Sequence, residues 1–204
     1  NDLNALKLRS LKIHEGEKAT VFFRLATLDD AAVDGQVNVL FGLTEKPIRF
    51  VGDFNNDAGP IVRLTKEPGF GPITLNARNG VGSEYTIGDT VLDFGGVYNI
   101  WIDVENKSND DGDVYSVYIA EEGQAERTVV FENFVSDRNP AGTVDLGKPK
   151  PDLMSLLVMS SGLNAGLGNL LFDDLYVSIG KFLDTVPVAS AFVGAAAPVI
   201  VLHS

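Results

Sequence analysis

The hydrophobic residues of this chain recur at every second position, which is the period of a β-strand and not of a helix. In residues 19–25, Ala19, Val21, Phe23 and Leu25 fall on one face. The same alternation recurs in four further segments: 36–43, 97–104, 114–120 and 169–179. Alternation with many β-branched and aromatic residues is typical of strands that are buried on one side. The chain therefore has to bury its strands against one another.

Turn-forming residues separate these segments. Gly, Asn, Asp and Pro cluster between them, for example at 52–60, 79–80, 109–113 and 162–168. This spacing is typical of a sandwich of antiparallel strands, and 109–112 reads as the turn of a hairpin. No segment shows a helical stripe with caps, although a short helical turn near 132–138 fits the sequence. We therefore predict an all-β antiparallel β-sandwich with little or no helix.

The composition limits the function classes. The 204 residues carry a formal net charge of −12, are 45% hydrophobic and include no cysteine. An acidic surface repels phosphate, so we expect no nucleic-acid partner and no anionic membrane surface. Positively charged ligands, metal ions and sugars remain open. Without cysteine the chain has no disulfides and no thiolate metal sites. It begins at Asn1, which we interpret as a trimmed secreted protein or an excised domain.

The last residues differ from the rest. Residues 188–202 (VASAFVGAAAPVIVL) carry no charge, are mostly apolar and are too short to span a bilayer. Their β-branched residues favour extended structure, and an apolar strand needs a sheet to cover it. We predict one domain over 1–187 and a tail over 188–204 that adds a strand. That strand either joins its own domain or is donated to a neighbouring copy.

Four segments carry a resemblance to a known family. They are Phe-Phe-Arg-Leu at 22–25, Phe-Gly-Leu-Thr at 41–44, the pair 98–104 and 113–119, and Leu-Phe-Asp-Asp-Leu-Tyr-Val at 171–177. Together they resemble the laminin-G-like, or concanavalin A-like, jelly-roll domains of secreted bacterial proteins, over roughly residues 5–187. The resemblance implies a jelly-roll sandwich, a location at the bacterial cell surface and carbohydrate as the ligand class.

Catalytic motifs are missing from the sequence. The two histidines, His14 and His203, lie near opposite ends, and no Gly-x-Ser-x-Gly or phosphate-binding loop occurs. Adjacent carboxylates such as Asp173 and Asp174 point to opposite faces of a strand, so adjacency does not make an acid–base pair. The acidic and basic signatures of jelly-roll glycosidases and alginate lyases are also missing. We therefore predict that the protein is not an enzyme.

Structural calcium is the expected cofactor. Asp53, Asn55 and Asp57 offer oxygen ligands at alternate positions of a loop, as hard cations require. The alternative is a turn capped by its own side chains. The resemblance implies a second calcium position at Asp173 or Asp174, with Glu15 or Glu17 as partners. There the alternative is a core carboxylate held by hydrogen bonds.

A sugar site needs an aromatic face and planar polar side chains. Trp101 is the only tryptophan and shares a strand face with Asn99 and Asp103; Arg78 is a plausible neighbour, together with Tyr115. The alternative is that Trp101 fills the sandwich core.

Three functions follow from these observations. The first is a non-catalytic extracellular binding or adhesion domain for carbohydrate. The second is a subunit of an extracellular filament or surface layer, assembled from copies of this chain by strand exchange through the tail. The third is a polysaccharide lyase or glycoside hydrolase of jelly-roll fold.

Overall fold

The computed structural model describes residues 5–27, 37–44, 58–66, 71–80, 85–107, 112–136, 152–160, 170–187 and 200–201. These residues form strands and turns, with no helix among them. The strands are β1 (Ala5–Ile13), β2 (Lys18–Thr27), β3 (Val37–Thr44), β4 (Ala58–Lys66), β5 (Ile73–Arg78), β6 (Tyr85–Leu92), β7 (Val97–Glu105), β8 (Asp113–Glu121), β9 (Thr128–Ser136), β10 (Leu153–Ser160), β11 (Leu170–Ile179) and β12 (Ile200–Val201).

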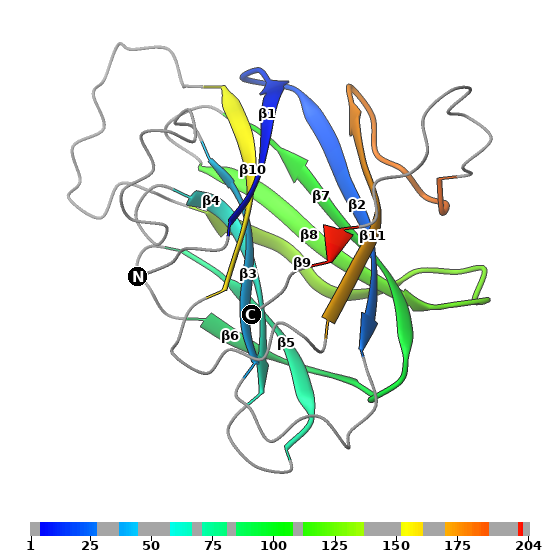
Figure 1. Cartoon of the computed structure of the whole chain (residues 1–204). Helices are drawn as coiled ribbons and strands as arrows, with labels where there is room; N and C mark the ends of the chain where they lie inside the picture. Colours follow the sequence, from blue (N-terminus) through cyan, green and yellow to red (C-terminus); the bar gives the residue numbers. More distant parts are fainter. Residues whose placement is uncertain are drawn as a thin grey trace.

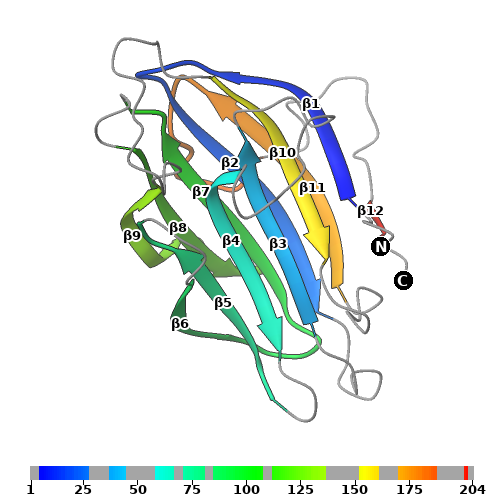
Figure 2. The ribbon, with the colours of Figure 1, turned by 90° about the vertical axis from the view of Figure 1, so that its left-hand side faces the viewer.

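The strands form two sheets that pack face to face (Figures 1 and 2). The first sheet has the order β1-β10-β3-β4-β5-β6, and the second has the order β12-β11-β2-β7-β8-β9. All neighbouring strands are antiparallel, and strands far apart in sequence pair across the sheets, as in a jelly roll. The predicted all-β antiparallel sandwich is confirmed.

The core lies between the sheets and follows the predicted alternation. In β2, Ala19, Val21, Phe23 and Leu25 all face it and are buried. In β3 the Phe41 ring stacks on the Phe23 ring across the sandwich, with centroids 4.6 Å apart. Phe172 of β11 contacts both rings, at 5.0 Å from Phe41 and 6.1 Å from Phe23. Three aromatic rings thus join the two sheets.

Each sheet also has an apolar cluster on its outer side. Leu40, Ile61 and Leu157 form one on the first sheet, and Tyr85 and Met159 pack against it. Phe22, Trp101 and Ala120 form the other on the second sheet, where Leu183 and Val186 are among the residues that pack against it. The outer side of each sheet therefore carries both apolar and polar side chains.

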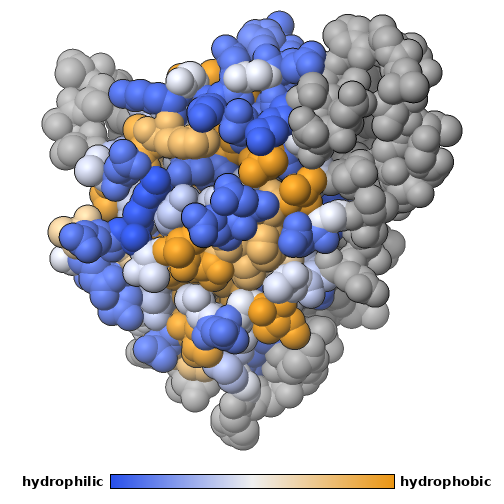
Figure 3. Space-filling model, turned by 180° about the vertical axis from the view of Figure 1, so that it is seen from behind, coloured by the Kyte–Doolittle hydropathy of each residue, from blue (hydrophilic) through white to orange (hydrophobic). Residues whose placement is uncertain are grey.

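The edge where β6 and β9 meet is a mixed surface. The two strands contact each other on one side of the sandwich. Ile87 and Val91 of β6 and Val129 of β9 are exposed there. Figure 3 shows this side, where hydrophobic residues form small groups among hydrophilic ones.

The helical turn considered near 132–138 is wrong for the described part of that segment. Residues 132–136 belong to β9, which pairs with β8. Asn133 adopts a φ of 54°, and its backbone N–H donates to Ser116 Oγ at 2.9 Å. A local irregularity in a strand thus produces the break in alternation. The described part of the chain has no helix, and so none there that is long and apolar enough to cross a membrane.

Two residues of the tail lie within the described structure. Ile200 and Val201 form β12 and pair with Phe172 and Leu171 at the edge of the second sheet. The rest of the segment 188–204 lies outside the described residues. Whether the tail adds its strand in its own chain or in a neighbour stays a prediction, as does the division at residue 187.

The aromatic contact between the sheets predicts the cost of removing it. Phe41→Ala should lower the free energy of unfolding by about 3–5 kcal/mol, because it deletes a buried ring and leaves a cavity. The matched control is Phe182→Ala, which removes the same ring at a position that is 36% exposed and should cost less than about 1 kcal/mol. Denaturant unfolding measures both. Equal costs would contradict the role given to Phe41.

Candidate functional site

The structure divides the four predicted sugar-binding residues between the two sheets. Asn99, Trp101 and Asp103 share the outer side of β7 in the second sheet, as their spacing predicted. Arg78 lies at the end of β5 in the first sheet. Tyr115, its expected neighbour, faces the core and donates its hydroxyl to the Arg78 carbonyl. The four residues therefore do not form one site.

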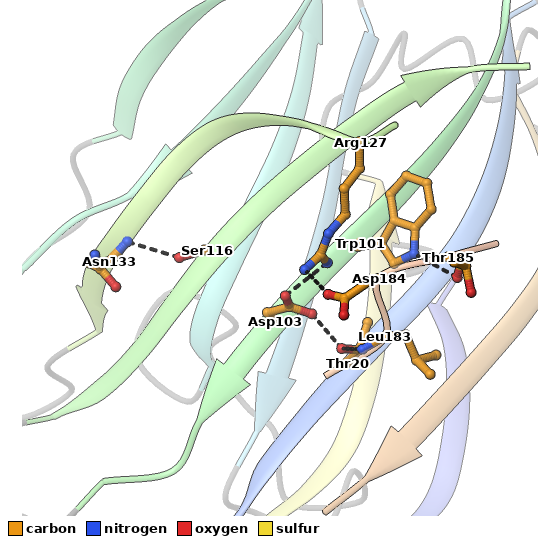
Figure 4. Close-up of polar contacts among 9 residues, drawn as sticks. All are labelled: Thr20, Trp101, Asp103, Ser116, Arg127, Asn133, Leu183, Asp184 and Thr185. Carbon is orange, nitrogen blue, oxygen red and sulfur yellow. Dashed lines mark hydrogen bonds and ion pairs between the residues drawn. The ribbon is translucent and has the colours of Figure 1, made fainter. Parts of the chain in front are cut away.

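Residues 180–187, which we call the strap, follow β11 and cross the outer side of the second sheet (Figure 4). The Leu183 N–H donates to Thr20 Oγ1 at 3.0 Å, and the Trp101 indole N–H donates to the Thr185 carbonyl at 3.4 Å. Trp101 is only 2% exposed. It is buried outside the sandwich core, beneath the strap, so it offers no free ring face to a sugar.

Asp103 anchors the strap through an ion pair. Its carboxylate accepts from the Thr20 hydroxyl and from Arg127 Nη1, the latter at 2.9 Å. Arg127 Nη2 pairs with Asp184 of the strap at 2.9 Å, and the guanidinium lies 3.9 Å from the Tyr118 ring centroid. Burial raises the pKa of Asp103, while Thr20 and Arg127 act to lower it. These groups thus serve to hold the strap in place.

The predicted calcium ligands lie in two places. Asp53, Asn55 and Asp57 are outside the described residues. Asp174 pairs with Arg24 Nη1 at 3.2 Å, and Asp173 Oδ1 accepts the Asp174 N–H at 2.8 Å. No group of three or more His, Asp or Glu side chains suited to a metal occurs in the described ranges.

A bulge in β11 changes the expected orientation of the two aspartates. Asp174 has a φ of 51° and lies within the register shift between Asp173 and Tyr176. Leu175 can therefore face the core, and both carboxylates are half-buried rather than one being fully buried. Glu17 precedes β2, whereas Asp173 pairs with Arg24 near its other end, roughly 20 Å away at ~3.3 Å per residue. These two groups cannot share one cation.

A polar array on the outer side of the first sheet was missed in the sequence. We call it the Arg63 face: Arg63 of β4, Asn38 of β3, Asn76 of β5, and Tyr85 and Ile87 of β6. Register aligns Arg63 with Asn76 and Asn76 with Ile87, so the three lie in one row across the strands. The residues come from four separate segments, and only the pairing of the strands brings them together. The sequence offered one signal for this face: polar residues alternate with the core residues along these strands, as Arg63 does between Val62 and Leu64.

Arg63 is held flat on this face. Its Nε donates to Asn38 Oδ1 at 2.7 Å, and its guanidinium carbon lies 5.1 Å from the Tyr85 ring centroid. Neither terminal nitrogen of Arg63 donates to any described residue. Arg63 and Tyr85 are both partly exposed. The guanidinium is therefore oriented by the protein and keeps two donors for a ligand.

The floor beside Arg63 is a hydrogen-bonded cluster. Asn76 Nδ2 donates to Thr65 Oγ1 at 2.6 Å, and the Thr65 and Thr74 hydroxyls are 3.1 Å apart. Asn76 is 3% exposed, and its side-chain oxygen has no partner among the described residues. Arg78, also buried, donates from Nη2 to the Gly59 carbonyl at 3.1 Å. Arg78 thus supplies a fixed positive charge below the surface.

Tyr85 lies close to both arginines and keeps its proton. Burial raises the pKa of Tyr85, and this effect outweighs the lowering by Arg78 and Arg63. At physiological pH the ring therefore presents a neutral hydroxyl. A neutral phenol can both donate and accept a hydrogen bond.

Comparison with known proteins identifies the fold. No model of a known protein family matches the sequence, and no curated protein does. The β-glucanase catalytic domain of family GH131 from Podospora anserina is similar in structure, with a TM-score of 0.50, 12% identity, and coverage of 91% of this chain and 69% of that one. This similarity supports a concanavalin A-like jelly roll.

Two further solved structures are more distant. The PL-14 alginate lyase from Aplysia kurodai has a TM-score of 0.49 and 11% identity, covering 82% of this chain and 71% of its own. A tetrameric galectin from the sponge Cinachyrella has a TM-score of 0.41 and 13% identity, covering 87% of this chain and 99% of its own. The neighbours by name include both lectins and enzymes. The link to secreted bacterial laminin-G-like domains stays a prediction.

The raised pKa of Asp103 predicts a pH dependence of stability. Because the pKa in the folded protein lies above the unfolded value of 3.8, this group contributes most to stability at low pH and loses that contribution as pH rises through the folded-state pKa. The free energy of unfolding of the wild type, minus that of Asp103→Asn, should therefore increase as pH falls from about 7 to about 4. Urea unfolding of both proteins measures it. If this difference decreases as pH falls, the lowering of the Asp103 pKa by Arg127 outweighs the raising by burial.

Proposed function

We propose that this protein is a secreted, non-catalytic binding module for carbohydrate, and that the Arg63 face is its binding surface. One observation carries the proposal. The Arg63 guanidinium is fixed between the Tyr85 ring and the Asn38 amide, and its terminal donors have no partner among the described residues.

The chemistry of this face suits a sugar. Carbohydrates offer hydroxyl oxygens around the ring and apolar C–H faces, so they need planar polar groups beside an apolar or aromatic surface. Arg63 supplies donors, Tyr85 supplies a ring edge and a hydroxyl, and Ile87, which is 74% exposed, supplies an apolar surface. Because Arg63 is already held in place, binding loses little side-chain entropy.

The strands of this face support a non-catalytic role. β3, β4 and β5 contain no Asp, Glu or His, and β6 contains a single carboxylate, Asp89. Glycoside hydrolysis in most families uses two carboxylates that flank the bond. The proposed location outside the cell rests on the resemblance of the sequence to secreted bacterial domains. Structural calcium at Asp53, Asn55 and Asp57, or at Asp173 and Asp174, stays a prediction.

A filament subunit is the second candidate function. Its support is that the outer edge of β11 accepts a strand, because Ile200 and Val201 pair there with Phe172 and Leu171. A donated copy of the same segment would make the same ladder in trans. Under this function, deletion of residues 188–204 should abolish large assemblies seen by light scattering. Assemblies that persist after the deletion would exclude strand exchange through the tail.

Binding to a glycan array tests the first proposal. The wild type should bind, and Arg63→Gln or Tyr85→Ala should weaken binding at least about tenfold, since a charge-assisted hydrogen bond contributes about 1.5–3 kcal/mol. The matched control is Arg24→Gln, an arginine on the outer side of the second sheet, which should bind like the wild type.

Two results would contradict this proposal. One is binding that Arg24→Gln weakens as much as Arg63→Gln does. The other is release of reducing ends or unsaturated sugars from a bound polysaccharide, which would show the enzyme of the third hypothesis.

A further inference from the structure

Charge is divided between the two sheets of this acidic protein. The second-sheet strands carry seven carboxylates and two cationic residues: Asp103, Glu105, Asp113, Glu121, Glu132, Asp173 and Asp174 against Lys18 and Arg24. The first-sheet strands carry six cationic residues and one carboxylate: Lys7, Arg9, Lys12, Arg63, Lys66 and Arg78 against Asp89. The net charge of −12 therefore hides a sheet whose own strands are positive.

The Arg63 face lies within this positive sheet. The strands on either side of β4, β3 and β5, contain no carboxylate, and the one carboxylate of the first-sheet strands, Asp89, lies on β6. Arg78 lies close enough to Tyr85, as does Arg63, to act on it electrostatically. Arg78 is buried and donates from Nη2 to the Gly59 carbonyl. The positive charge that this face offers to a ligand is therefore that of Arg63, whose terminal nitrogens donate to no described residue.

We infer that the ligand of the Arg63 face is an anionic glycan, whose carboxylate or sulfate oxygens accept from the terminal nitrogens of Arg63. This inference rests on the proposed function and adds the charge of the sugar to it. The guanidinium fork matches two oxygens of a carboxylate or sulfate better than isolated hydroxyls. Binding such a group also neutralises a cation that no described residue pairs with.

Neighbouring residues on the same row fit a sugar ring around that anion. Asn76, next to Arg63, has a buried side-chain oxygen to which no described residue donates. Ile87, next in the row, is largely exposed. Strands lie about 4.8 Å apart, so the row spans about 10 Å across β4, β5 and β6. An acidic sugar lying across the strands can place its charge at Arg63 and its apolar face at Ile87.

A pair of probes that differ only in charge tests the inference. Hexagalacturonate carries carboxylates, and its methyl ester keeps the same backbone without them. Calorimetry with the full chain should show at least about tenfold tighter binding of the acid, and the difference should shrink as salt rises from about 20 to about 150 mM. Dextran sulfate against dextran makes the same comparison for sulfate and shows which anion the site prefers.

The outcomes separate the inference from the function beneath it. Equal or tighter binding of the ester and of dextran would overturn the anionic ligand and leave carbohydrate binding standing. No binding to either anionic probe would overturn the inference whatever the glycan array shows. Equal affinity for oligo-dT would show attraction to any polyanion and would also overturn it.

Substitutions at Arg63 and Ile87 test whether the preference for an anionic sugar arises at this face, and they are chosen so that the protein still folds. Arg63→Lys keeps the charge but loses the fork, so it should weaken hexagalacturonate binding about tenfold while Tm changes little. Ile87→Lys should strengthen binding and Ile87→Glu weaken it, each roughly twofold at low salt, because the position is exposed and beside the fork. These two variants need no change in the folded core.

The matched controls are Ile179→Lys and Ile179→Glu. Ile179 is 44% exposed at the end of β11 in the second sheet, away from the edge where β6 and β9 meet, and the two substitutions change the net charge by the same amounts. They should leave the affinity for hexagalacturonate unchanged. Equal effects at residues 87 and 179 would mean that net charge alone controls binding, and the inference would be wrong.

Discussion

The packing of Phe41 against Phe23 and Phe172 is the contact on which the rest of the structure depends. It joins the two sheets across the core, and it fixes which side of β2, β3 and β11 faces inward. Because side chains alternate along a strand, fixing the inner side also fixes the outer side. The ion pair of Asp103 and the orientation of Arg63 are both consequences of this choice.

The polar groups on the two outer sides are bonded differently. On the second sheet the strap covers Phe22 and Trp101 and is held by Asp103 and Arg127, so polar groups there are used within the protein. On the first sheet Arg63 is fixed in place with its terminal donors unused by the described residues. Under the proposed function, stability and recognition therefore fall on opposite sides of one sandwich.

The sequence predicted the fold well and the site poorly. The period of two in segments such as 19–25 fixes which residues are buried, because it depends on local geometry alone. Trp101 was placed on the correct face, but the strap that buries it comes from residues 180–187 and no local pattern predicts that contact. The Arg63 face depends on register between strands, which a sequence read alone does not give. The net charge of −12 suggested an acidic surface throughout, because a total charge does not show how the charged residues divide between the two sheets.

We propose that the first sheet binds an acidic sugar through Arg63. Two-dimensional NMR of the labelled protein, titrated with hexagalacturonate, tests this binding directly because the Nε–Hε signal of an arginine reports its own contacts. The Arg63 side-chain signal and the backbone amides of Asn76, Tyr85 and Ile87 should shift together, while those of Trp101 and Asp103 should stay in place. Shifts confined to the second sheet or the strap would contradict it.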